Sequence, residues 1–336
     1  MKKADLFQAL NAVKPGLANK EVIEQSSSFV FLENKVITYN DEISISCPVP
    51  GLNLKGAVKA GELYKLLEKI DKEEFDFDIA DNEIQIKFGR GKAGMRIQSE
   101  ISIPLDEIKD RDDWRELPEG FVRHLQFVMG ACSSDMSKPI LTCVNICQDG
   151  RMEASDGFRL TRYKGQEIPI EDFLLPHTAC PHVVRINPVE IAKSNGWIHF
   201  RNQEDVVLSC RIFEDKFPIV DAILKISGTE ITFPNTLSSL IDKAIVFSKR
   251  EHDLDESILI TIANNRLTIR GESETGWYEE MCNMKCDKNE IKFSIMPSMF
   301  QKILNHSNTA IIAEGDNKIK FTGDTWEHII MLRKTS

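Results

Sequence analysis

One pattern occurs three times in this chain of 336 residues, at intervals close to a third of its length. A polar two-residue turn leads into an alternating strand at 33–39, 149–155 and 264–270, in steps of 116 and 115 residues. Solenoid repeats are about 20–50 residues long, so this period is too long for a solenoid. It predicts three tandem domains of one architecture, each with its own core. We expect them at 1–116, 117–229 and 230–336.

Two stretches with helical spacing of apolar residues flank each turn. The six stretches are 4–10, 61–67, 121–131, 188–192, 237–247 and 297–304. Pro188 and Pro297 stand where the first turn of a helix tolerates a missing N–H. Two helices and several alternating strands in each copy predict an α+β fold, with the helices packed on antiparallel sheets. Chance similarity among alternating strands is the competing explanation, and the shared order of the landmarks argues against it.

The composition is ordinary for a globular chain, with 42% apolar residues. We find no run of about 18 apolar residues, the length that a membrane span needs. The N-terminal residues Lys2 and Lys3 lead straight into the first predicted helix, without the apolar core of a signal peptide. These features predict a cytoplasmic protein.

The eight cysteines include two pairs at a spacing of four residues, Cys143 with Cys147 and Cys282 with Cys286. Both pairs lie in strand-like stretches, where residues i and i+4 are about 13 Å apart. Zinc requires sulfur atoms about 2.3 Å from one ion, which such a spacing does not provide. We therefore predict buried, reduced thiols rather than a metal site or disulfides.

Residues 89–94 spell the G-x-G-x-x-G pattern of dinucleotide-binding loops. Such a loop must open a helix whose N-terminus holds the pyrophosphate, whereas residues 95–99 alternate like a strand. The glycines therefore predict a hairpin and no cofactor. No other catalytic motif stands out, and an enzyme with three structural repeats remains only an outside alternative.

Charge is unevenly distributed between the predicted helices and the rest of the chain. The net charge of −10 by itself argues against a nucleic-acid binder. Stretches drawn around the helices nevertheless hold 13 Lys or Arg against 5 Asp or Glu. These stretches are 2–20, 59–70, 121–134, 187–197, 235–250 and 296–307. If the helices share one face, that face is basic and suits phosphates; a general preference of helices for lysine is the alternative.

The middle copy carries the clearest local motif. Residues 153–160 read Glu-Ala-Ser-Asp-Gly-Phe-Arg-Leu and resemble the A-T-D-G-H-R-L segment of the bacterial DNA polymerase III beta subunit, the sliding clamp. Gly157 provides the permissive backbone of a tight turn there. Residues 213–218 resemble that family's D-G-x-F-P-D-Y segment, and 265–269 and 329–333 also resemble their counterparts. The resemblance extends over essentially the whole chain.

This resemblance implies a fold, an assembly and a function. Family members are non-catalytic accessory subunits of DNA polymerase III that form a head-to-tail homodimeric ring, with basic helices lining the channel. The ring encircles duplex DNA and tethers the polymerase and the clamp loader through short peptides. We therefore expect a DNA clamp fold, no enzyme activity, no cofactor and no metal. The alternative is a clamp-like protein that closes no ring and binds or inhibits replication partners.

Two surfaces follow for the expected ring. Lys20 matches a DNA-facing position of the family's first domain, and Lys138 matches a DNA-contacting loop that here lacks its usual aromatic residues. With the lysines of the predicted helices, the expected DNA-facing residues are Lys3, Lys14, Lys20, Lys138, Lys243 and Lys249. Edge strands should pair between subunits, because exposed apolar edges otherwise aggregate. The expected interface residues are Met95, Ile97, Ile245 and Val246.

The resemblance also implies a hydrophobic pocket for partner peptides. Its matching residues are Leu141, Ser155, Gly157, Phe158, Arg159, Leu160, Pro218, Ile223, Ile329, Met331 and Leu332. Ordinary inter-domain core is an equal alternative for the apolar members Leu160, Pro218 and Ile223. Phe158 replaces the usual histidine, Asp221 and Ala222 replace a tyrosine-arginine-arginine stretch, and residues 331–336 depart from the terminal M-P-M-R-L. An altered peptide preference follows, as in a clamp carried by a phage or mobile element.

Overall fold

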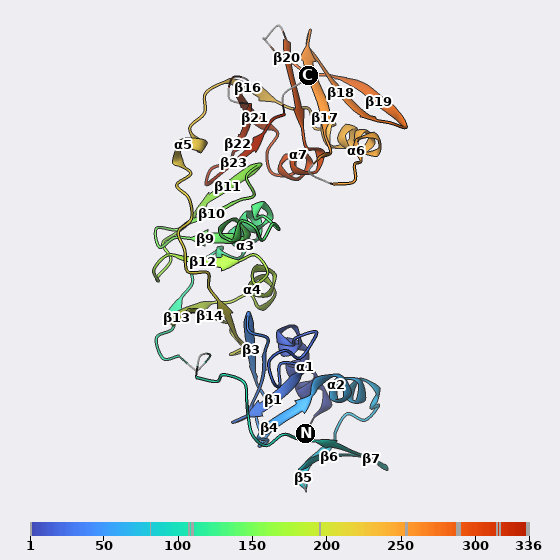
Figure 1. Cartoon of the computed structure of the whole chain (residues 1–336), viewed down its shortest axis with the longest axis vertical. Coiled ribbons are helices and arrows are strands. Elements are labelled where there is room, and N and C mark those ends of the chain that lie inside the picture. Colours follow the sequence, from blue (N-terminus) through green and yellow to red (C-terminus); the bar gives the residue numbers. More distant parts are fainter. Residues whose placement is uncertain are drawn as a thin grey trace. The chain divides into compact units, whose positions relative to one another are not determined.

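The computed structural model describes residues 2–80, 82–106, 108, 111–194, 196–252, 255–286, 290–313, 315 and 317–333. The last three residues of the divergent C-terminus, 334–336, thus lie outside the described residues. The chain forms two compact units (Figure 1). Unit 1 comprises Met1–Met129, Cys143–Gly150 and Gln166–Asp215; unit 2 comprises Gly130–Thr142, Arg151–Gly165 and Lys216–Ser336. The division into three domains stays a prediction.

The described helices fall mostly where the periodicity predicts them. They are α1 (Lys3–Val13), α2 (Ala60–Lys69), α3 (Phe121–Val128), α4 (Cys180–Ile186), α5 (Asp221–Leu224), α6 (Leu237–Ser248) and α7 (Pro297–Leu304), with short 3-10 helices η1 (Lys14–Gly16), η2 (Met129–Ala131) and η3 (Pro139–Thr142). Five of the six predicted helices are confirmed. Helix α7 starts at Pro297 and buries Met299, Phe300 and Ile303 on one side. Contacts join α1 to α2, α3 to α4 and α6 to α7.

The predicted helix at 188–192 is wrong. The helix in this region is α4, which ends at Ile186, before the predicted helix begins. Asn187 then adopts a left-handed conformation with φ of 48°. The chain then forms strand β13 (Glu190–Ser194), in which Ile191 pairs with Phe200 of β14 (Trp197–Arg201). A stretch of five residues is too short to separate the helical period from the strand period, and pairing with β14 selects the strand. Pro188 therefore stands outside any helix.

Unit 1 contains an antiparallel sheet of eight strands in the order β4-β1-β2-β3-β15-β14-β13-β8, and a smaller sheet β5-β6-β7. The remaining strands of unit 1 are β1 (Ser28–Leu32), β2 (Lys35–Tyr39), β3 (Ile43–Pro48), β4 (Gly56–Lys59), β5 (Asp76–Ala80), β6 (Glu83–Phe88), β7 (Gly91–Arg96), β8 (Arg115–Glu116), β9 (Cys143–Ile146), β12 (Phe173–Pro176) and β15 (Val207–Arg211). Strand β3 pairs with β15 from Ile43–Cys210 to Ser46–Val207, which joins segments far apart in sequence. A core of Val30, Tyr39, Ala57 and Trp197 lies on this sheet.

Unit 2 contains the strand order β10-β11-β23-β22-β21-β16 and a four-stranded sheet β19-β18-β17-β20. Its strands are β10 (Arg151–Ser155), β11 (Arg159–Lys164), β16 (Thr229–Thr232), β17 (Ile258–Ala263), β18 (Arg266–Ser273), β19 (Gly276–Asn283), β20 (Glu290–Ile295), β21 (Thr309–Ala313), β22 (Lys318–Thr322) and β23 (Trp326–Met331). Helix α6 packs on β17, β18 and β19. Phe233, Phe300 and Phe321 form an aromatic cluster with centroids 5.1–6.3 Å apart.

Two of the three predicted turns, at 33–34 and 264–265, have the same backbone geometry. Glu33 and Asn34 both have positive φ, as do Asn264 and Asn265, which is the geometry of a two-residue type I′ hairpin turn. The G-x-G-x-x-G stretch is a hairpin as predicted, because β6 and β7 pair from Phe88–Gly91 to Glu83–Arg96. The mixed α+β fold with antiparallel sheets is therefore confirmed.

Candidate partner-binding and DNA-facing sites

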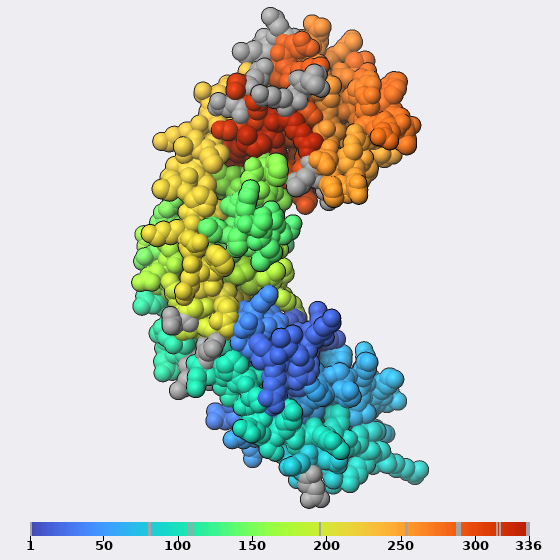
Figure 2. Space-filling model, viewed as in Figure 1, coloured from blue at the N-terminus to red at the C-terminus, as the bar shows by residue number. Residues whose placement is uncertain are grey.

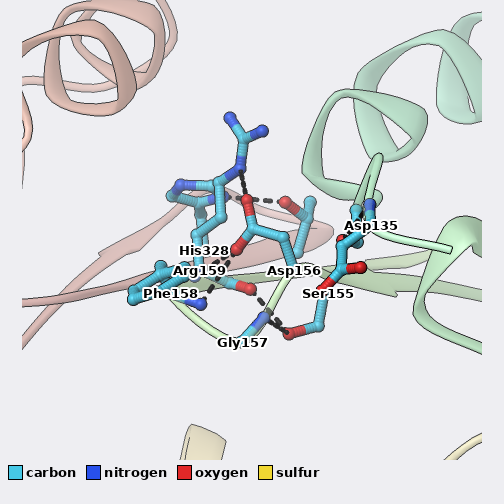
Figure 3. A network of polar contacts seen from close by, with 9 residues as sticks. Asp135, Ser155, Asp156, Gly157, Phe158, Arg159 and His328 are labelled. Carbon is cyan, nitrogen blue, oxygen red and sulfur yellow. Dashed lines mark hydrogen bonds and ion pairs between the residues drawn. The ribbon is translucent and has the colours of Figure 1, made fainter. Parts of the chain in front are cut away.

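A tight turn between β10 and β11 holds four of the predicted pocket residues (Figure 3). The Asp156 Oδ1 atom accepts hydrogen bonds from the backbone N–H groups of Phe158 and Arg159, both at 2.9 Å. Its other oxygen, Oδ2, accepts from Arg159 Nε at 2.9 Å. Ser155 Oγ donates to the Arg159 carbonyl at 2.7 Å and accepts from the Gly157 N–H at 3.1 Å. With φ of 89°, Gly157 needs the conformational freedom of glycine.

The C-terminal strand β23 pairs with β11 and so lies beside this turn. Leu160 is opposite Ile329, Arg159 is opposite Ile330, and the Met331 N–H donates to the Phe158 carbonyl at 2.8 Å. Figure 2 shows the two segments side by side, green for the β10–β11 region and red for β22 and β23. The paired residues are about half the chain length apart in sequence. Their pairing brings together the two predicted parts of the peptide site, the β10–β11 turn and the C-terminal strand.

The apolar part of the site is a small cluster of buried side chains, Leu160, Val220, Leu224 and Ile329, with Phe217 and Ile226 packed against it. Several apolar side chains next to this cluster remain accessible. Ile219 is 89% exposed, Phe158 47%, Ile223 40% and Met331 37%. Such accessible apolar groups over a rigid core are suited to the anchor residues of a peptide. We call Phe158, Ile223 and Met331 the apolar anchors.

Only part of this cluster was predicted from the sequence. Leu160 and Ile329 are core residues of it, whereas Pro218 and Leu332 differ: Pro218 is exposed and Leu332 is buried. Leu141 is half-buried in η3, which packs against β10. Val220 and Leu224 were missed, although their spacing of four residues at α5 is the usual sign of one helix face.

The polar surroundings explain what Asp221 does in place of a basic residue. Arg162 contacts Glu153 Oε1 and, at 2.7 Å, the Asp221 carboxylate. The hydrogen bond from Arg162 holds the pKa of Asp221 below its usual range. Arg162 is therefore committed to two carboxylates, one of them the buried Glu153, and has little positive charge left for a peptide.

His328, on β23, is a buried group that sequence analysis did not identify. Its Nδ1 lies 2.8 Å from Thr161 Oγ1, and its Nε2 has no hydrogen-bond partner among the described residues. Burial, together with the charge of Arg159, lowers the pKa of His328 to about 3. The imidazole is therefore neutral at physiological pH and acts as part of the sheet core.

The predicted DNA-facing lysines have very different partners. Lys243 pairs with Glu280 at 2.7 Å and Lys249 pairs with the buried Glu256 at 2.9 Å. Lys3 is half-buried and donates to the Ile70 carbonyl. The others are exposed, Lys14 with its ammonium over the Tyr64 ring, and Lys20 and Lys138 on loops.

The predicted interface residues also differ from one another. Met95 is half-buried on β7, the edge strand of its sheet. Ile97 is buried by its own chain against Gly56, so it has little apolar area left for a second subunit. Ile245 is half-buried and Val246 exposed on α6. The neighbouring edge strand β19 exposes Trp277 and Met281, which sequence analysis missed although they share one face at a spacing of four.

The cysteines do not point to another kind of site. Five of the eight are buried: Cys47, Cys143, Cys147, Cys180 and Cys210. The prediction of buried thiols is confirmed for these, whereas Cys132, Cys282 and Cys286 are half-buried. Across the described residues, no three His, Cys, Asp or Glu side chains are grouped to hold a metal ion. None of the helices in the described part of the chain is long and apolar enough to cross a membrane.

The architecture is that of the sliding clamps of bacterial DNA polymerase III. The DNA polymerase III beta chain of Streptococcus pneumoniae superposes with a TM-score of 0.87 at 18% identity, covering 99% of this chain and 98% of that one. The Bacillus subtilis DNA polymerase sliding clamp gives 0.85 at 15% identity, covering 100% and 98%. The Pseudomonas aeruginosa sliding clamp bound to griselimycin gives 0.84 at 13% identity, also covering 100% and 98%.

These likenesses establish the fold over the whole chain, as the sequence motifs predicted. No protein-family profile and no curated protein sequence matches the chain. The function therefore rests on the surfaces described above together with the fold.

Proposed function

We propose that this chain is a non-catalytic DNA sliding clamp of the cytoplasm, an accessory subunit of a DNA polymerase III. Two copies form a head-to-tail ring around duplex DNA, and the ring tethers polymerase and clamp loader through their short peptides. The observation that carries the proposal is the clamp fold over 98–100% of both chains in each comparison. Enclosure also accounts for an acidic protein that handles DNA, because sliding does not need a tight grip on phosphates.

The peptide-binding role is supported by the apolar anchors. Phe158, Ile223 and Met331 are accessible beside the cluster built on Leu160 and Ile329. The Asp156 network fixes the turn that carries Phe158, so its position is set before a peptide arrives. A preorganised apolar surface loses little entropy on binding. With Arg162 already paired, acidic residues flanking the peptide motif contribute little.

The ring role is supported by two edge strands, β7 in unit 1 and β19 in unit 2. Met95 lies on the first, and Val246, Trp277 and Met281 are exposed near the second. Edge strands with accessible apolar side chains are usually covered by a partner strand. Pairing β7 of one copy with β19 of another forms a closed ring when it occurs twice.

Retention on circular DNA tests the ring. Loaded onto a nicked circular plasmid by a clamp loader, the protein should stay bound and should be released when the plasmid is linearised. Solution mass should correspond to a dimer at micromolar concentration, and Trp277→Asp with Met281→Asp should shift it toward the monomer. Exposed Val22→Asp in unit 1 is the matched control. A monomeric wild type, or equal retention on circular and linear plasmids, would overturn the proposal.

Titration with a Gln-Leu-x-Leu-Phe peptide tests the partner site. Clamp–peptide affinities in the micromolar range correspond to about −8 kcal/mol, and losing one apolar anchor costs about 1–3 kcal/mol. Phe158→Ala, Ile223→Ala and Met331→Ala should therefore each weaken binding about tenfold or more. Val22→Ala removes part of an aliphatic side chain that is 91% exposed in unit 1, and it should have no effect. Wild-type affinity in all three anchor variants would show that the peptide binds elsewhere.

Two observations favour the alternative, a clamp-like protein that closes no ring and binds or inhibits replication partners. Ile97 is already buried within its own chain, and Lys243 and Lys249 are already ion-paired. A monomer that still binds the peptide would assign the protein to this second class.

A further inference from the structure

A cavity of about 270 Å³ lies in unit 1, between the eight-stranded sheet and described residues of the segment 105–114. Polar side chains line it from the strands β3, β14 and β15: Ser44, Ser46, His199 and Ser209. The segment contributes larger side chains, among them Leu105, Ile108 and Trp114. We call this space the serine-lined cavity.

Strand pairing places the polar side chains on one face of the sheet. Ser44 of β3 is opposite Ser209 of β15, and Ser209 is opposite His199 of β14. Directly opposite residues share a face, and so do residues two apart along a strand, which adds Ser46. Neighbouring strands are about 4.8 Å apart. The three serine hydroxyls are therefore close enough together to contact one small molecule.

The serines are small side chains on a face that elsewhere carries large ones. Tyr39 is opposite Ser44 and is buried in one cluster with Trp197. Leu105 and Ile108 pack against this cluster. A serine side chain is shorter than these rings, so space remains beneath the covering segment. Protein interiors are close-packed, and a polar space of this size holds water or a ligand.

His199 orients the hydroxyl of Ser209. Its Nδ1 lies 2.7 Å from Ser209 Oγ, and its Nε2 lies 2.8 Å from Ser194 Oγ. Burial lowers the pKa of His199 to about 4, so the ring is neutral and has one donor and one acceptor nitrogen. In either tautomer the Ser209 hydroxyl uses one role on the imidazole and keeps the other. Because Ser209 is buried, the remaining role is available only inside the cavity that it lines.

The other two hydroxyls also keep hydrogen-bonding capacity. Ser44 Oγ donates to the Thr38 carbonyl at 2.9 Å, and its lone pairs remain able to accept. Ser46 Oγ makes no hydrogen bond with any of the described residues. The three serines thus offer donors and acceptors to a ligand, which relieves the cost of leaving buried hydroxyls without partners.

The rest of the lining is balanced in charge and partly apolar. Its charged side chains are Glu33, Lys35, Asp106 and Arg111. Arg111 is held by Asp113 through two hydrogen bonds of 3.0 and 3.1 Å. The two described cations and two described carboxylates of the lining give no net charge that would attract an ion. Ile37 and Val207, both opposite Ser46, add apolar contact area.

We propose that the serine-lined cavity binds a small neutral ligand with one ring and several hydroxyl groups. This chemistry is shared by cyclic polyols, monosaccharides and the sugar of a nucleoside. Ligand hydroxyls donate and accept, so they match the serines, while the C–H groups of the ring pack on Ile37, Val207 and Trp114. Pockets for drug-sized ligands have about 300–1,000 Å³, so about 270 Å³ suits a single ring. Such binding is separate from the proposed clamp function and does not depend on it.

Titration of the full chain with three neutral probes tests the cavity: myo-inositol, glucose and adenosine. Calorimetry and ligand-detected NMR should show at least one of them binding with a dissociation constant of about 1 mM or lower. Ser46→Leu fills the cavity and should abolish this binding, whereas Ser46→Ala removes one hydroxyl and should weaken it about fivefold. The matched controls are Ser99→Leu and Ser99→Ala, at an exposed serine of unit 1 outside the lining. They should leave the affinity unchanged.

The probe that binds identifies the source of the ligand. Binding of myo-inositol or glucose assigns a free polyol or sugar, and binding of adenosine alone assigns a nucleoside. If no probe binds, or if both Ser46 variants bind as the wild type does, the cavity holds water only and the proposal is overturned. Free glutamate binding more tightly than every neutral probe would overturn the assignment to a neutral ligand. Melting temperatures check the fold, and Ser46→Ala, the smaller change, decides the test if Ser46→Leu is destabilised.

Discussion

Helices α1 and α6 occupy equivalent places in the sequence repeat, yet their lysines are used differently. At the end of α1, Lys14 stacks on Tyr64 and lines a cleft without carboxylates. On and after α6, Lys243 and Lys249 are held by Glu280 and Glu256. The three lysines count equally in the sequence. Among them, only Lys14 has no carboxylate partner within the described residues. The basic character of a helix is therefore decided by its tertiary neighbours.

Two buried histidines also differ in their partners, here in the hydrogen bonds of the ring nitrogens. His199 in unit 1 contacts Ser194 Oγ through Nε2 at 2.8 Å and Ser209 Oγ through Nδ1 at 2.7 Å. His328 in unit 2 contacts Thr161 through Nδ1, and its Nε2 has no partner among the described residues. Burial lowers the pKa of His199 to about 4 and that of His328 to about 3. Both are neutral, but only His199 has both nitrogens satisfied.

Acid sensitivity gives the largest expected effect. The folded pKa of each histidine is depressed below the usual 6.5, so the unfolded chain takes up a proton first. The contribution of each neutral histidine to the unfolding free energy is therefore fully present above pH 6.5. It is lost as the pH falls toward about 4 for His199 and about 3 for His328. Between pH 6.5 and 5 each histidine should cost about 2 kcal/mol of unfolding free energy. Urea unfolding at both pH values measures this loss.

Leucine variants of the two histidines sharpen the comparison. His199→Leu and His328→Leu should each remove about 2 kcal/mol of the acid-dependent loss. At pH 7.5, however, His199→Leu should be the more destabilising, because it leaves two serine hydroxyls without a partner, whereas His328→Leu removes an unsatisfied nitrogen. Equal costs at pH 7.5 would show that the missing bond at His328 Nε2 has no energetic consequence.

The sequence predicted those elements whose periodicity is long. Helices α1, α6 and α7 each bury several residues at a spacing of three or four, which a strand cannot reproduce. The helix prediction at 188–192 failed because five residues fit both the helical and the strand period. Placing the helix there also meant that α4, just before it, was not predicted. Arg185 was therefore not recognised as a helical cation.

The candidate sites were predictable only where the motif is local. The turn from Ser155 to Arg159 is built from its own side chains, and its residues were identified from the motif. The partners of the lysines were not, since Lys243 pairs with Glu280 at a separation of 37 residues. Counting charges along the sequence cannot show that a distant carboxylate neutralises a lysine. The cluster that contains Val220 and Leu224 likewise forms only when β11 and β23 pair.

Methionine substitutions of three lysines give the smaller effect and test the first comparison directly. Methionine keeps much of the side-chain volume and removes the charge. Lys249→Met should lower the unfolding free energy by about 1–3 kcal/mol, because the buried Glu256 carboxylate loses its cation. Lys243→Met should cost less unfolding free energy than Lys249→Met, since Glu280 is accessible to water. Lys14→Met should cost about 0.5 kcal/mol, the contribution of an exposed cation–π contact. Thermal and urea unfolding at pH 7.5 measure all three, and the opposite order would show that Lys14 serves the fold rather than a ligand.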